Sequence, residues 1–118
     1  MIYHRDIGFP KTLVIPEVTV SLGYTRHAQE RKNESYKLMV VPTVVKIQPS
    51  NVVEAHTDDN INITKVLVRI NYNKTQDMLL VLQPILEKGL AKVITLWVNN
   101  KRDVHKTLKK QYDKPCDM

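Results

Sequence analysis

Four apolar segments in the second half of the chain, separated by short polar turns, constrain the fold more than any other feature. They cover residues 52–56, 61–72, 77–83 and 92–98. Turn-forming residues occupy the gaps, as in Asp58-Asp59-Asn60 and Asn73-Lys74-Thr75-Gln76. Successive strands joined by short turns pair antiparallel, so we expect this half of the chain to form an antiparallel meander.

The first half of the chain combines an extended segment with a short helix. Residues 14–22 alternate with a period of two, which predicts a strand, and Pro16 would confine that strand to a sheet edge. Thr25 is a suitable N-cap for a helix over residues 26–32. Residues 39–47 are apolar but contain Pro42, which indicates a loop that can include a short strand. We therefore expect an α+β fold with one or two N-terminal helices packed on a four- to five-stranded antiparallel sheet.

The composition is that of one ordinary globular domain. The chain has 118 residues, of which 42% are hydrophobic and 25% are charged. This length suffices for one core and is too short for two packed domains. We expect a single domain over residues 1–118, with an extended N-terminal segment (1–22) and a basic C-terminal tail (100–118).

Several classes of protein are disfavoured. Three glycines cannot build a Gly-rich phosphate loop, and the longest apolar run, residues 78–82, is too short to cross a membrane. Cys116 is the single cysteine and no signal-like segment follows the first charges, so we expect a cytoplasmic protein. Asp58 and Asp59 beside His56 could bind an ion, but Asp-Asp-Asn is also a standard turn. We expect neither a metal nor a cofactor.

The positive charge is concentrated in the second half of the chain. The net charge is +6, while residues 1–60 carry seven basic and seven acidic groups. Residues 61–118 carry eleven basic and five acidic groups, and the last eighteen residues hold half of the excess. A one-sided basic surface suits a polyanion such as RNA; the alternative is a solvated face that aids solubility.

Two of the expected strands carry polar groups on one face. Side chains at positions i and i+2 of a strand share a face. These polar-bearing faces comprise Lys65, Leu67, Arg69 and Asn71 on one strand, and Val93, Thr95, Trp97 and Asn99 on the other. If the two faces coincide, they form a cationic floor with a stacking ring for a nucleotide. The alternatives are an ordinary solvent-exposed sheet face and, for Trp97, a place in the core.

Two histidines stand near cations. His27 and Arg31 lie four residues apart and so share a face of the expected helix. His105 lies in the polar run that follows the last strand, with Lys101, Arg102, Lys106 and Thr107. Two histidines with Lys and Arg can cleave RNA without a metal, because they supply a base, an acid and cations for the phosphorane. The alternative is a surface histidine and a basic tail.

Several strings together resemble a family of small, mostly phage-encoded proteins of the RelE-like (barnase–EndoU–colicin–RelE) class of metal-independent ribonucleases. They are His27-Ala28-Gln29-Glu30-Arg31, Thr64-Lys65-Val66-Leu67-Val68-Arg69, Val93-Ile94-Thr95-Leu96-Trp97 and Asp103-Val104-His105-Lys106-Thr107-Leu108. The likeness covers residues 22–115. It implies helices followed by a four-stranded antiparallel sheet, RNA as substrate, and a bacterial host cytoplasm as the setting. It also implies a pocket with His27, Lys65, Arg69, Thr95 and His105.

We therefore expect a metal-independent endoribonuclease that acts by 2′-OH transesterification. The catalytic candidates are His27, His105, Arg31, Lys65, Arg69 and Thr95. The RNA-binding candidates are Trp97, Asn99, Lys101, Arg102, Lys106 and Thr107. One alternative is a non-catalytic phage accessory module that docks on RNA, a ribosome or a host protein through its basic face. Another is an assembly protein that pairs through an open sheet edge.

Overall fold

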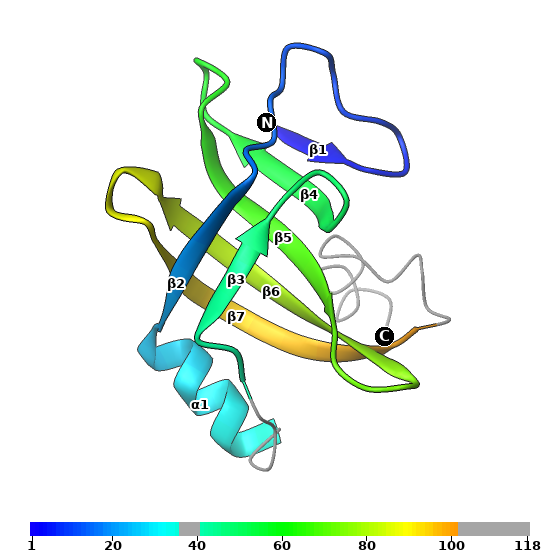
Figure 1. The fold of residues 1–118 in the computed structure, drawn as a ribbon, viewed down its shortest axis with the longest axis vertical. Coiled ribbons are helices and arrows are strands. Elements are labelled where there is room, and N and C mark those ends of the chain that lie inside the picture. The colour runs from blue at the N-terminus through cyan, green and yellow to red at the C-terminus, as the bar shows by residue number, and fades with distance from the viewer. Residues whose placement is uncertain (36–40, 102–118) are drawn as a thin grey trace.

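The computed structural model describes residues 1–35 and 41–101, and most of their regular structure is β-strand (Figure 1). The strands are β1 (Ile2–His4), β2 (Val18–Tyr24), β3 (Val44–Ile47), β4 (Val52–Thr57), β5 (Ile63–Asn71), β6 (Gln76–Ile85) and β7 (Leu90–Asn100). The helices are α1 (Arg26–Ser35) and the single-turn 3₁₀-helix η1 (Leu86–Lys88).

All seven strands belong to one sheet, in the order β1-β4-β5-β6-β7-β2-β3. Each pair of neighbours is antiparallel except β2 and β7, which are parallel. The meander from β4 to β7 is as the turn pattern predicts. The expected α+β fold, with helices on a four- to five-stranded antiparallel sheet, is wrong, and so is the fold that the RelE-like resemblance implies. The described chain forms a curled, mixed seven-stranded half-barrel with one short α-helix.

The parallel pair explains why the expected fold is wrong. Ser21 to Tyr24 of β2 pair with Leu90 to Val93 of β7, which lies far along the sequence. This pairing puts β2 inside the sheet, between β7 and β3, rather than at the edge that Pro16 suggested. Pro16 itself precedes the strand, so it removes no ladder hydrogen bond.

The helix α1 begins where the sequence predicts. The Thr25 Oγ1 accepts a hydrogen bond from the Ala28 N–H at 3.2 Å, which satisfies one of the unpaired donors of the first turn. The same hydroxyl donates to the Val93 carbonyl of β7 at 2.9 Å. Ala28 is fully buried in the core. Thr25 therefore caps the helix and joins it to the sheet.

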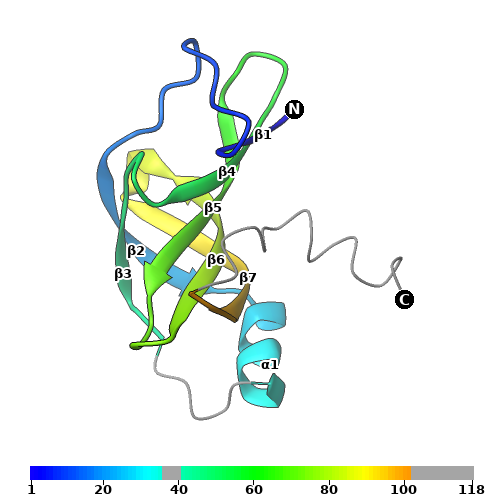
Figure 2. The same ribbon diagram turned by 90° about the vertical axis from the view of Figure 1, so that its right-hand side faces the viewer.

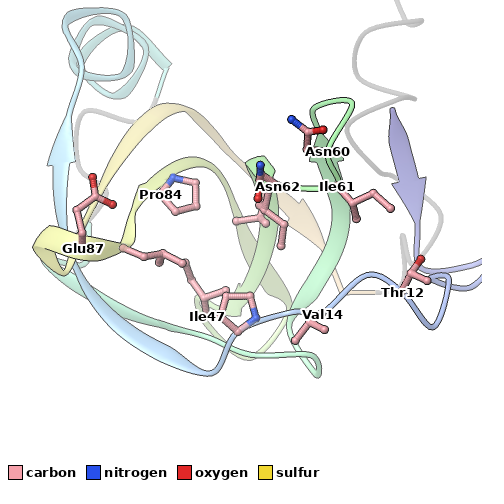
Figure 3. Close-up of a pocket in the computed structure, with 12 residues that line it drawn as sticks. Thr12, Val14, Ile47, Asn60, Ile61, Asn62, Pro84 and Glu87 are labelled. Carbon is pink, nitrogen blue, oxygen red and sulfur yellow. The ribbon is translucent and has the colours of Figure 1, made fainter.

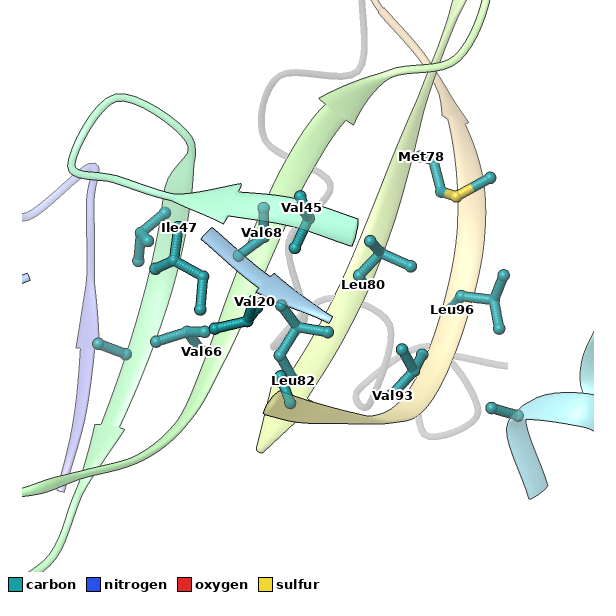
Figure 4. Packing of buried hydrophobic residues seen from close by; sticks show 14 of the residues in the cluster. Val20, Val45, Ile47, Val66, Val68, Met78, Leu80, Leu82, Val93 and Leu96 are labelled. Carbon is teal, nitrogen blue, oxygen red and sulfur yellow. The ribbon is translucent and has the colours of Figure 1, made fainter. Parts of the chain in front are cut away.

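The curl of the sheet gives it a concave face, which holds the main core. Side chains from β2 and β3 meet side chains from β5, β6 and β7 across this face (Figure 4). The fully buried members include Val20, Ile47, Val66, Val68, Leu80, Leu82, Val93 and Leu96. Burying each such side chain contributes about 1.5–3 kcal/mol. Figure 2 shows β2 and β3 on one side of this space and β5 and β6 on the other.

The turn between β4 and β5 holds a strained residue. Ile61 has a φ of 61°, the only positive φ of a non-glycine residue in the described part of the chain. This conformation costs a β-branched residue about 1–2 kcal/mol. Asp58 Oδ1 fixes the turn by accepting the N–H groups of Asn60 at 2.9 Å and Asn62 at 3.0 Å. These hydrogen bonds lower the pKa of the Asp58 carboxyl. Asp58 therefore stabilises the turn, which was the alternative to binding an ion.

Replacing Thr25 by Ala should lower the free energy of unfolding by about 1–2 kcal/mol, because the helix loses its cap and its bond to β7. Urea unfolding followed by far-ultraviolet circular dichroism measures this loss. Thr43→Ala is the control, since Thr43 is exposed and lies outside the regular elements. Equal stability of the two variants would contradict the capping role.

Candidate nucleic-acid interface

The register of β5, β6 and β7 brings most of the predicted polar residues onto one surface. Leu67 pairs with Val81, which pairs with Thr95. One step along, Arg69 pairs with Leu79, and Leu79 with Trp97; then Asn71 pairs with Asp77, and Asp77 with Asn99. Residues paired across a sheet point to the same side. The faces that bear Lys65, Arg69, Thr95, Trp97 and Asn99 therefore coincide, on the side opposite the main core, here named the convex face.

One end of the convex face is a network around a single carboxylate. Asp77 Oδ1 accepts a hydrogen bond from the Lys101 Nζ at 2.7 Å, and Asp77 Oδ2 lies 3.8 Å from the Arg69 Nε. The Lys101 ammonium also donates to the Asn71 Oδ1. The side chains of Arg69 and Asp77 are 20% and 16% exposed, so their charges are partly shielded from water. Arg69 and Lys101 therefore share the Asp77 carboxylate.

The middle of the convex face is apolar. Trp97 is only 3% exposed and packs in a cluster with Val53, Leu67, Leu79 and Val81. Its Nε1–H is buried without a hydrogen-bond partner among the described residues. Trp97 therefore packs in the core, which was the alternative to stacking on a base.

The other end of the convex face carries an imidazole held by a buried carboxylate. The Glu54 side chain is 3% exposed, and its Oε2 lies 3.0 Å from the Nε2 of His56, which is 18% exposed. Across the strands, His4 of β1 pairs with Glu54, and Lys65 of β5 pairs with His56. An imidazole that is fixed through one nitrogen can transfer a proton through the other.

The sequence does not place this pair on the convex face because β4 is irregular. Strict alternation puts Val52, Glu54 and His56 on one face. A register shift between Val52 and Glu54 instead turns Val52 into the main core and leaves Glu54 and His56 on the convex face. A β-bulge of this kind redirects side chains near one strand position and gives no periodic signal. The signal that was available is the Glu-x-His spacing itself.

Two of the remaining predicted site residues lie on the helix α1 and not on the strands of the convex face. His27 is exposed in the first turn of α1, and Arg31 lies further along the same helix. Four candidates lie outside the described residues, namely His105, Arg102, Lys106 and Thr107. The expected pairing of His27 with His105 therefore stays a prediction. In the described part of the chain, no group of three or more His, Cys, Asp or Glu residues could hold a metal ion.

No family model, curated protein sequence or solved structure matches the chain. No helix among residues 1–35 and 41–101 is both long and apolar enough to cross a membrane.

Replacing Asp77 by Asn should cost about 1 kcal/mol of unfolding free energy, between the values of exposed and buried ion pairs, because Arg69 and Lys101 lose their shared carboxylate. Urea unfolding at low salt measures the loss, which should shrink in about 1 M salt because screening weakens the pair. Asp59→Asn makes the same charge change at an exposed turn. A similar loss in both variants would contradict the network.

Proposed function

We propose that the protein binds RNA through the convex face. The proposal is supported above all by the shared face of Lys65, Arg69, Thr95 and Asn99, which follows from the strand register. Alternation predicted Val93 on this face and Lys92 on the opposite one, and both placements are wrong. An irregularity in the pairing of β6 with β7 turns Val93 into the main core, so its neighbour Lys92 joins the convex face. Cations and hydrogen-bonding groups on one surface suit a phosphate backbone.

The charge of the chain supports the same surface. β7 ends at Asn100, and Lys101 lies in the Asp77 network at the edge of the convex face. The last eighteen residues, which begin with Lys101, carry half of the net charge of +6. The most basic part of the sequence therefore starts beside Arg69 of β5, because Lys101 and Arg69 share the Asp77 carboxylate.

The double variant Lys65→Gln/Lys92→Gln should bind a fluorescein-labelled single-stranded RNA about tenfold more weakly at about 50 mM salt, by fluorescence anisotropy. The slope of log affinity against log salt should fall by about 1.4, because the variant no longer neutralises two phosphate groups of the RNA. Lys46→Gln/Lys88→Gln removes the same charge at β3 and η1. This control should bind nearly as the parent does, and an equal loss in both variants would contradict a specific face.

A second candidate function is metal-independent cleavage of the bound RNA, and the Glu54–His56 pair favours it. The sequence proposes His27 and His105 as acid and base, and His56 adds a third imidazole, beside Lys65. In this step a histidine takes the proton of the 2′-OH, and the 2′-oxygen attacks the phosphorus. The bond to the 5′-oxygen breaks, that oxygen receives a proton, and a 2′,3′-cyclic phosphate remains.

RNA cleavage should persist in EDTA and fall at least about tenfold in His56→Ala, since one positioned base or acid supplies roughly 10²–10⁴-fold. Product ends are identified by mass spectrometry. His27→Ala and His105→Ala are measured alongside, and His4→Ala controls for loss of a histidine on the same face. Binding by the parent without any cleavage would reject catalysis and leave RNA binding in place.

A further inference from the structure

A pocket of about 710 Å³ opens at one end of the half-barrel. Five parts of the described chain form it: the segment before β2, the end of β3, the turn from β4 into β5, the first half of β5, and the end of β6 with η1. Figure 3 shows Glu87 and Pro84 on one side of the pocket and Val14 and Thr12 on the other. The volume falls in the range of about 300–1,000 Å³ that is usual for small-molecule sites.

The floor of this pocket is the main core, and part of its rim is apolar. Ile47 and Val66 at the floor are buried, with 0% and 1% of their surface exposed. At the rim, Val14, Leu86 and Ile61 are 76%, 43% and 41% exposed. Apolar side chains thus run without a break from the core to the surface, as in the mouths of β-barrels that hold ligands.

The strained turn is a second observation that points to the same place. Ile61 adopts a left-handed conformation, although its neighbours Asn60 and Asn62 are of a type that accepts that conformation more readily. The hydrogen bonds of Asp58 fix the turn, and Ile61 lines the pocket. The large apolar side chain of Ile61 is therefore held at the mouth of the pocket, although a β-branched residue disfavours this backbone conformation. Such strain is characteristic of ligand sites.

The charge of the lining defines the ligand further. Glu87 is the only charged residue among the described residues that line the pocket, although the chain as a whole carries +6. This lining contains neither lysine nor arginine, and its other polar residues are Thr12, Asn60 and Asn62. We infer that the pocket binds a small amphiphile with an apolar body and a cationic head, such as an amine, and that the head lies toward Glu87.

A neutral fluorescent reporter tests this inference on the full chain. N-phenyl-1-naphthylamine should bind with a rise in fluorescence. Octylamine, octanol and octanoate have similar apolar chains and differ in the charge of the head group. Comparing how well each displaces the reporter therefore distinguishes the effect of the apolar chain from the effect of the charge. We expect octylamine to displace the reporter at least threefold better than octanol, and octanoate to be the weakest. Glu87→Gln should abolish the difference between octylamine and octanol.

Ile61→Asn tests the mouth without disturbing the core. We expect reporter affinity to fall at least fivefold while the melting temperature stays within about 3 °C of the parent, because relief of strain offsets the removal of apolar packing at the mouth. Ile7→Asn is the matched control, since Ile7 is 90% exposed and lies outside the pocket. It should bind the reporter as the parent does.

Four results would overturn the inference. The first is no reporter binding by the parent chain. The second is equal loss of affinity in Ile61→Asn and Ile7→Asn, which would mean a general apolar effect. The third is octanoate as the strongest competitor, which would mean that the net positive charge of the protein, and not Glu87, determines which ligand binds best. If sedimentation shows a dimer that Ile61→Asn dissociates, a second copy covers the pocket, and this also overturns the small-molecule proposal.

Discussion

The parallel pairing of β2 with β7 is the constraint on which the rest of the structure depends. It connects the first half of the chain to the last described strand, and β3 then extends the sheet beyond β2. The sheet curls, so Val20 of β2 and Ile47 of β3 contact the side chains of β5 and β6. The core would otherwise be one open face of a four-stranded meander, with no second layer to exclude water. Thr25 strengthens the join by bonding the Val93 carbonyl at the end of this pair.

The local elements could be predicted from the sequence, and their assembly could not. Alternation and turn residues correctly located β4 to β7, and Thr25 correctly marked the start of α1. These signals lie within a few residues of the structure they specify. The contact between Ser21 and Leu90 has no local signal, because a parallel pair needs no connecting turn and leaves each strand with an ordinary pattern. The three-residue strand β1 is too short to show a period at all.

Part of the candidate site could likewise be predicted from the sequence, and part of it could not. The shared face of Arg69 and Trp97 was predictable, since short turns fix the register of a meander and register fixes the face. The position of Glu54 and His56 was not predictable, because the irregularity in β4 reverses the face of Val52 relative to theirs. Burial of Trp97 also depends on the whole assembly, as a lone aromatic in a strand can face either the core or the solvent.

The proposed RNA-binding face and the proposed ligand pocket belong to the same sheet but are stabilised by different interactions. On the convex face, charged groups are arranged around carboxylates, so Asp77 and Glu54 each hold a cationic or titratable partner in place. At the pocket, the hydrogen bonds of Asp58 fix the turn that holds Ile61 in its strained conformation beside the core. Strain of this kind persists only where surrounding bonds over-determine the backbone. Because Val66 lines the pocket from β5 and its neighbour Lys65 faces the other way, the alternation of side chains along one strand separates the proposed ligand pocket from the proposed RNA-binding face.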